Sequence, residues 1–350
     1  MPRISLVVCL KGERDLLQRL LAHANECFDD LVVVHDGPVN WCRGPAANQA
    51  DQFGEPERLT PEQLSLVAPS APVSSIARDY ATIVPGGDAP AGYRLVDTTP
   101  LEGSIHDLVS IHRGRFYEGP LCFQQEPHWP FAWSRAAHDW ILRLDADEFP
   151  SGELRSFLQS FRKQSVERAE TAGFACVWPF WDGKKATTRN WPNDRLFLFN
   201  RRKVKFFGMA EQTPIPQGKV ERRKEVLRHE PHGKRYGLRK VIMRKQAGRW
   251  RRVIAESLLE SPLSLPRWQW REAEWPEGWQ RLRGQPIREA FCRLLLMPIH
   301  QAREMRRTGN RVDLSACYGS AVQHFLLGLL YWTLARSRSR TMHRLVTSNQ

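Results

Sequence analysis

The stretch WILRLDADEFP, residues 140–150, decides the fold of this chain. Its apolar first half suits a buried strand, and the Pro-Ser-Gly sequence that starts at Pro150 predicts where this strand ends. Acidic residues follow the apolar run at once, and open α/β sheets bind ligands at the carboxyl ends of their strands. In extended chain Asp145 and Asp147 would point the same way, because they are two residues apart. Two aligned carboxylates favour a divalent cation, Mg²⁺ or Mn²⁺, that carries a phosphate group.

Two further buried strands are predicted near the N-terminus. Residues 4–10 are almost continuously apolar, and residues 31–35 repeat this pattern after a predicted amphipathic helix at 13–23. The β-α-β order predicts an α/β fold that begins with a nucleotide-binding half-sheet. Asp36 ends the second strand and could accept hydrogen bonds from a base or a ribose, or it could simply form an Asp-Gly-Pro turn. These strands favour the metal site over the alternative for an isolated D-x-D, a charged turn that closes an edge strand.

Together, residues 4–13, 31–38 and 140–150 resemble GT-A glycosyltransferases of the large family 2 group. The last stretch is most similar to bacterial members that read DWILxLDADEF, some of which build lipopolysaccharide core or other surface glycans. The resemblance covers residues 3–42 and 120–245. It implies a GT-A fold, which is a Rossmann-like nucleotide-binding sheet with a D-x-D motif. It also implies transfer of a sugar from a UDP-, GDP- or ADP-sugar donor to a glycan or lipid-linked acceptor.

The resemblance also implies roles for the candidate donor-site residues. A divalent metal, Mn²⁺ or Mg²⁺, would be held by Asp147, Asp145 and His229 and would act as a Lewis acid on the diphosphate. Asp145 would also hold the ribose or a metal-bound water, while Asp36 and Glu13 would contact the nucleotide. For His229 the alternative is a histidine that only holds the end of a strand.

Inversion at the sugar, which the resemblance implies, requires a general base that deprotonates the acceptor hydroxyl. The first candidate is Glu211, in a segment similar to the family pattern FxGxxHE, although Ala210 stands where that pattern often has His. The second candidate is Asp194, for which the alternative is a turn cap.

The composition is that of a globular protein. The chain has 350 residues, 41% of them hydrophobic, and a mean hydropathy of -0.49, which excludes a disordered chain or a protein with many membrane spans. Its 7 cysteines form no C-x-x-C pair, so we expect reduced thiols and no zinc site. Because the first residues enter a strand directly, we expect no signal peptide and a cytoplasmic location, with attachment to the cytoplasmic face of the inner membrane as an extension.

The positive charge favours anionic partners. The net charge is +14, and residues 201–252 carry 18 Lys and Arg against 4 acids. This run coincides with the region expected to hold the acceptor, so it favours a phosphorylated acceptor, although a solvated face is the alternative. No recognisable nucleic-acid module accompanies it, so nucleic acid is not an expected partner.

A non-catalytic basic protein on a degenerate transferase fold remains the alternative function. A nucleotidyltransferase ranks lower because the turn at 11–13 has a single Gly.

Composition also sets the predicted domains. Residues 1–255 are expected to form the GT-A domain, with a Pro-, Ala-, Gly- and Ser-rich insertion at about 43–115. Residues 256–286 are rich in Pro and Trp and predict an irregular linker, and residues 287–350 predict an amphipathic helical region. Its apolar run 322–334 is too short to span a bilayer, which takes about 20 residues. Aromatic residues and the arginines that follow predict an interfacial helix on an anionic membrane surface, or else a helix packed on its own core.

Several elements of the first domain are predicted by pattern alone. Residues 152–165 predict a helix and residues 174–180 a strand. Residues 195–199 and 204–208 both alternate apolar and polar side chains, which predicts the two strands of a hairpin around a turn at 200–203.

Overall fold

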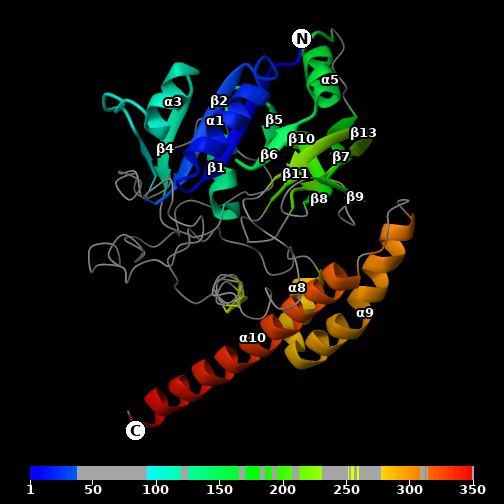
Figure 1. Ribbon diagram of the computed structural model, residues 1–350. Coiled ribbons are helices and arrows are strands. Elements are labelled where there is room, and N and C mark those ends of the chain that lie inside the picture. Colours follow the sequence, from blue (N-terminus) through cyan, green and yellow to red (C-terminus); the bar gives the residue numbers. More distant parts are fainter. Residues whose placement is uncertain are drawn as a thin grey trace. The chain divides into compact units, whose positions relative to one another are not determined.

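The computed structural model contains two compact units, Met1–Lys234 with Ser264–Gln269, and Arg235–Leu263 with Trp270–Gln350 (Figure 1). The structure describes residues 1–37, 93–119, 125–164, 170–181, 186–190, 195–206, 213–230, 251, 254–255, 258–259, 277–307, 312 and 314–348.

The first unit is an α/β domain, as the sequence predicted. Within the described residues its central sheet has the strand order β3-β4-β2-β1-β5-β10-β7-β13-β6. The strands in this order are β3 (Arg94–Leu95), β4 (Arg115–Gly119), β2 (Asp30–Asp36), β1 (Ile4–Leu10), β5 (Trp140–Arg143), β10 (Arg195–Asn200), β7 (Thr171–Val177), β13 (Lys219–His229) and β6 (Glu148–Pro150). Strands β4, β2, β1 and β5 are parallel to one another, while β10 runs antiparallel to both of its neighbours. The predicted β-α-β start and the strand before the acidic residues are therefore confirmed.

Helices cover both faces of the parallel strands. They are α1 (Arg14–His23), α3 (Ile105–Ile111), η4 (Glu126–His128), α4 (Trp129–Arg135) and α5 (Gly152–Arg162). Alternate residues of each strand join one core cluster with the leucines and phenylalanines of α1, α3 and α5. The intervening residues, such as Val7 and Ile141, are also buried and lie on the opposite face, to which α4 contributes Trp129 and Trp133. Apolar residues on both faces explain why the strands are continuous apolar runs in the sequence.

The chain turns between β5 and α5 in a way that the sequence did not predict. Residues 145–148 form a turn, in which the N–H of Glu148 donates to the carbonyl of Asp145 at 2.9 Å. Residues 148–150 form β6, which pairs antiparallel with β13. The D-x-D residues are therefore not in extended chain, and the expectation of one strand that ends at Pro150 is wrong. Helix α5 begins at Gly152 as predicted, and the hydroxyl of Ser151 caps it by accepting the N–H of Leu154 at 3.2 Å.

The two strands and the turn predicted at 195–208 are present as far as the structure describes them, but their predicted pairing as a hairpin is wrong. β10 lies between β5 and β7, and the short strand β11 (Val204–Lys205) pairs instead with β12 (Ile215–Pro216). Three consecutive buried residues, Phe197 to Phe199, are apolar on both sides of the strand and suit a central position. The 3₁₀ turn η5 (Arg201–Lys203) separates the two strands, and Asn200 caps it. A second small pair joins β8 (Pro179–Trp181) and β9 (Ala186–Asn190).

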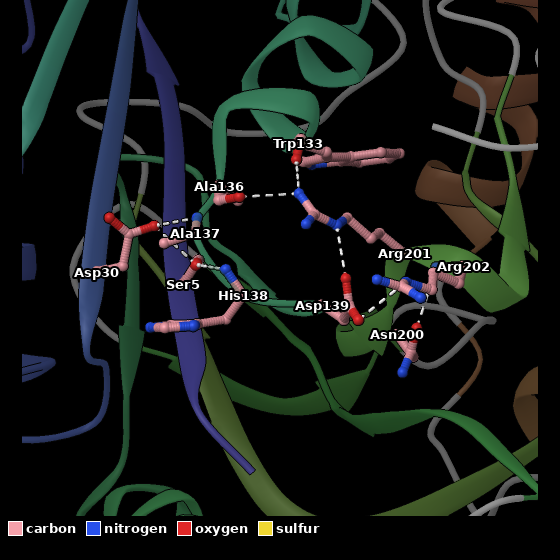
Figure 2. Close-up of polar contacts among 10 residues, drawn as sticks. All are labelled: Ser5, Asp30, Trp133, Ala136, Ala137, His138, Asp139, Asn200, Arg201 and Arg202. Carbon is pink, nitrogen blue, oxygen red and sulfur yellow. Dashed lines mark hydrogen bonds and ion pairs between the residues drawn. The ribbon is translucent and has the colours of Figure 1, made fainter. Parts of the chain in front are cut away.

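A buried arginine holds the segment that enters β5 (Figure 2). Arg201 is 3% exposed. Its guanidinium donates to the carbonyl oxygens of Trp133 and Ala136 at 2.6 and 2.9 Å. It also donates to the carboxylate of Asp139 at 3.1 Å, and the exposed Arg202 pairs with the other oxygen of that carboxylate at 2.9 Å. The turn after β10 is thereby tied to the end of α4 and to the start of β5.

A second polar cluster fixes the same segment against β1 and β2. Asp30 accepts the hydroxyl of Ser5 and the N–H of Ala137, both at 2.7 Å (Figure 2). The Ser5 hydroxyl oxygen in turn accepts the N–H of His138 at 3.0 Å. Two clusters therefore hold the amino end of β5, whose other end carries the D-x-D residues.

The second unit contains the described helices α8 (Glu277–Gly284), α9 (Pro286–Arg307) and α10 (Leu314–Ser348). Helix α8 lies inside the segment predicted as an irregular linker, most of which is outside the described residues. Helices α9 and α10 pack against each other. They approach closely at Gly328, where an added Cβ would lie 2.6 Å from that of Ala290. None of the helices in the described part of the chain combines the length and apolarity needed to cross a membrane.

The described cysteines are free thiols. Cys9, Cys27, Cys176 and Cys317 are buried, whereas Cys292 of α9 is half-buried. Burial raises the pKa of the Cys27 thiol to about 11, and it also raises that of Cys9. The thiols of Cys9 and Cys27 are therefore poor nucleophiles at neutral pH.

Candidate functional site

The candidate site lies where parallel strands end together. The register pairs Leu10 of β1 with His35 of β2, and Val7 of β1 with Arg143 of β5. The residues that follow these strands leave the sheet at one edge, which is where open α/β sheets bind ligands. Of the predicted site residues, Glu13, Asp36, Asp145 and Asp147 all follow or end these strands. The candidate bases Glu211 and Asp194 lie outside the described residues.

The pairing of β6 with β13 brings His229 to the D-x-D turn. Its register sets His229 opposite Glu148, and the N–H of Glu230 donates to the carbonyl of Asp147 at 2.8 Å. The Nε2 atom of His229 then lies 3.4 Å from Oδ2 of Asp147. Two of the three predicted metal ligands, 82 positions apart in the chain, are thus adjacent.

The imidazole of His229 is held in place by an aromatic ring. It stacks on the indole of Trp178, with ring centroids 4.8 Å apart and an interplanar angle of 28°. The Nδ1 atom is buried and has no hydrogen-bond partner in the described part of the chain. The stacked ring therefore directs Nε2, the nitrogen that most often binds metals, toward the carboxylate of Asp147.

Asp145 is held by a different partner. Its Oδ2 atom accepts a hydrogen bond from Arg195 at 2.6 Å, and its N–H donates to Glu148 at 2.9 Å. The expectation that the carboxylates of Asp145 and Asp147 are aligned is therefore wrong. The carboxylate of Asp145 contacts Arg195, whereas that of Asp147 contacts His229. Within the described residues, no three His, Cys, Asp or Glu side chains are grouped as a metal site.

The pair of Asp147 and His229 nevertheless fits one metal ion. Two ligands that bind at about 2.1 Å and about 90° apart lie about 3 Å from each other. The observed 3.4 Å is near this separation. A carboxylate and an imidazole suit Mn²⁺ and similar ions, and substrate phosphate oxygens and water commonly complete such a shell.

One arginine is shared by the buried carboxylate of Glu148 and by the carboxylate of Asp145, which is 20% exposed. Besides Asp145, Arg195 pairs with Glu148 at 3.0 Å. Burial alone would lower the pKa of Arg195, but the two carboxylates raise it above its ordinary value. One cation cannot neutralise both acids. Burial, together with the neighbouring charge of Asp145, therefore raises the pKa of Glu148 to about 7.

This raised pKa predicts a pH dependence of stability. The folded protein retains the Glu148 proton to higher pH than the unfolded chain. Its contribution to stability is complete below 4.5, the ordinary pKa, and is lost as the pH rises through about 7. The Glu148→Gln variant should lack this loss, because its amide does not titrate and can still accept the N–H of Asp145. Urea unfolding on both sides of this window tests the prediction, and equal pH slopes in the two proteins would contradict it.

Arg143 is a functional candidate that the sequence reading missed. It is 1% exposed, and none of its guanidinium nitrogens has a hydrogen-bond partner among the described residues. The guanidinium lies over the ring of Trp129, 4.2 Å from its centroid. Burial and the like charge of Arg195 lower the pKa of Arg143 to about 10, so it is a cation at neutral pH. The available signal was a charged residue inside an otherwise apolar strand.

His128 is a second residue that the sequence did not reveal. Its side chain is fully buried. Its Nε2 donates to Asp36 at 3.0 Å, and its Nδ1 lies 3.0 Å from the hydroxyl of Tyr93. Asp36 is therefore at the strand end as predicted, but it is 3% exposed and held by the chain itself.

Glu13 has a structural partner as well. Its carboxylate accepts the N–H of Lys11 at 2.5 Å and closes the turn between β1 and α1. Gly12 at the centre of this turn has φ +77°, a backbone conformation that favours glycine. The predicted role of Glu13 toward a nucleotide stays a prediction.

Comparison with models of known protein families and with curated protein sequences finds no match to this chain.

Proposed function

We propose that the protein is a metal-dependent GT-A glycosyltransferase. It would move a sugar from a UDP-, GDP- or ADP-sugar to a glycan or lipid-linked acceptor, in the biosynthesis of bacterial lipopolysaccharide or another surface polysaccharide. The observation that carries this proposal is the approach of His229 to Asp147, 3.4 Å apart at the carboxyl edge of the sheet. Such a pair fits a divalent ion on a diphosphate.

The arrangement of the sheet supports the proposal. Parallel strands β4, β2, β1 and β5 form a half-sheet that suits a nucleotide, and the D-x-D turn follows β5 directly. The antiparallel strand β10 then supplies Arg195 to this turn. A metal site beside the end of a nucleotide-binding half-sheet is the arrangement that the GT-A resemblance implies.

In the proposed mechanism each residue has a separate task. Asp147 and His229 would hold the metal, which supplies Lewis-acid stabilisation of the departing diphosphate. Arg195 fixes the turn by holding Asp145 and Glu148. Buried cations act strongly on nearby charges because the protein interior screens them little, so Arg143 adds positive potential at this edge of the sheet.

The acceptor side of the mechanism depends on residues outside the described part. Glu211 is proposed as the general base that deprotonates the acceptor hydroxyl, with Asp194 as the second candidate. Attack from the face opposite the leaving diphosphate would invert the configuration at the sugar.

One observation favours a second candidate, a non-catalytic basic protein on a transferase fold. The net charge of +14 would attract any polyanion. Such a protein would bind oligonucleotides or anionic lipid without a preference for one nucleoside diphosphate.

A thermal-shift panel of nucleoside diphosphates with and without Mn²⁺ tests the proposal. One nucleotide should raise the unfolding temperature only with the metal, because binding to the folded state adds about 2.7 kcal/mol at a hundred times its Kd. The exposed-carboxylate variant Asp15→Asn should respond like the wild type, whereas Asp147→Asn should not respond. An unchanged unfolding temperature with every nucleotide would contradict the transferase proposal and favour the basic binder.

A further inference from the structure

Helix α9 exposes a set of large apolar side chains. Phe291, Leu295, Leu296 and Ile299 are 50%, 66%, 61% and 50% exposed. At 100° per residue they fall within an arc of about 140°, so they form one stripe along the helix. We call these four side chains the α9 stripe. Past the short connection to α10, Leu314 and Tyr318 are exposed as well, at 61% and 52%.

The exposed charges of α9 are all basic. Arg288, Arg303 and Arg306 are exposed, and the helical repeat places all three within the same arc as the apolar residues. Neither of the two acidic residues of α9 is exposed. Glu289 is 8% exposed and pairs with Arg281 and Arg293, and Glu304 is half-buried. The α9 stripe therefore has cations at both ends and no exposed acid on its own helix.

The combination of exposed apolar side chains and exposed arginines favours some binding partners over others. Burying an exposed apolar side chain is favourable by about 25 cal/mol for each Å² of apolar surface removed from water. A neutral protein groove would cover the apolar residues without using the arginines. The boundary of an anionic bilayer satisfies both, because the acyl region takes the apolar groups and the phosphates take the arginines.

We propose that α9 binds the surface of an anionic membrane, lying in its plane with the α9 stripe inserted. The arginines in the arc prevent the helix from spanning, because their guanidinium groups must stay at the headgroups. This location differs from the run 322–334 that the sequence favoured. In that run Leu327 and Tyr331 are buried, which leaves less apolar surface to insert. The proposal concerns a surface separate from the D-x-D site and does not rest on the proposed function.

Vesicle co-sedimentation of the full chain tests the proposal. The vesicles are phosphatidylcholine alone, or phosphatidylcholine with a third replaced by phosphatidylglycerol. The wild type should bind the anionic vesicles and bind the neutral ones at least tenfold more weakly. Leu295→Glu with Ile299→Glu should abolish sedimentation. Arg303→Gln with Arg306→Gln should weaken anionic binding roughly 30-fold, and added salt should reduce the difference from the wild type.

Ile111→Glu is the matched control. Ile111 is 69% exposed but belongs to α3 of the first unit, so this variant should sediment like the wild type. Circular dichroism checks that each variant keeps its helices. If the double Leu295 and Ile299 variant loses its helical signal, the single variant Leu295→Gln is tested in its place. We expect it to bind the anionic vesicles at least several-fold more weakly than the wild type.

Two outcomes would overturn the proposal. One is equal sedimentation of the wild type and a folded stripe variant. The other is that the wild type does not bind vesicles but is a dimer by light scattering, whereas the stripe variant is a monomer. In that case the α9 stripe faces a second copy of the chain.

Discussion

Asp147→Asn is expected to reduce sugar transfer about a thousandfold while the protein remains folded. The substitution keeps the size of the side chain but removes the negative charge that would hold the metal beside His229. Metal stabilisation of a departing diphosphate is worth several kcal/mol, and each factor of ten in rate corresponds to about 1.4 kcal/mol.

Turnover should be measured with the donor that the nucleotide panel identifies, over a titration of Mn²⁺. The affinity for metal should fall in Asp147→Asn. It should also fall in His229→Gln, but by a smaller factor. Asp15→Asn serves as the control because its carboxylate is exposed and belongs to α1. Near-normal turnover of Asp147→Asn at any metal concentration would disprove the assignment of the metal to this pair.

Asp145→Asn separates the two acids of the motif. Asp145 pairs with Arg195 at 2.6 Å, so its loss should act first on the position of the turn. Its affinity for metal should change less than that of Asp147→Asn.

Arg201→Met is expected to lower the free energy of unfolding by about 3–6 kcal/mol, because two buried backbone carbonyls each lose a hydrogen bond from a charged donor, worth about 1.5–3 kcal/mol each. Arg201 is 3% exposed and satisfies two backbone carbonyls as well as the carboxylate of Asp139. Methionine fills much of the same volume but donates no hydrogen bond. The carbonyls of Trp133 and Ala136 would then stay buried without this donor.

Arg202→Met provides a matched control, because Arg202 pairs with the same carboxylate from a side chain that is 64% exposed. Its effect should stay below about 1 kcal/mol, as for most exposed ion pairs. Chemical unfolding of the two variants under the same conditions compares them directly. Equal losses of stability would show that the buried hydrogen bonds of Arg201 are not what holds the entry to β5.

The strands of the half-sheet were predictable because their physical cause is local. Residues 6–10, 31–34 and 140–142 are apolar on both faces, and burial on both faces of a parallel sheet demands that pattern. Helix α5 was predictable from the Ser151 cap and the spacing of its apolar residues. The false hairpin at 195–208 had an equally good local pattern. Its first strand pairs instead with β5 and β7, which are distant in the sequence.

The candidate site was only partly predictable for a related reason. The resemblance pointed to His229, and the register of β13 against β6 sets that residue beside Asp147. The separation of the two D-x-D carboxylates depends on Arg195, whose position no local pattern indicates. Arg143 and His128 escaped notice because buried charged or polar residues look like surface residues in a sequence.

The cysteines offer a means of spectroscopic labelling. Cys292 is half-buried on α9, between residues of the stripe, whereas the other described thiols are buried and protected from alkylation. With Cys42 and Cys122, which lie outside the described residues, replaced by serine, a maleimide fluorophore would attach mainly at position 292. Its emission would report the polarity around α9 in real time, and quenchers in water or in lipid would give the depth of the helix without altering any residue of the stripe.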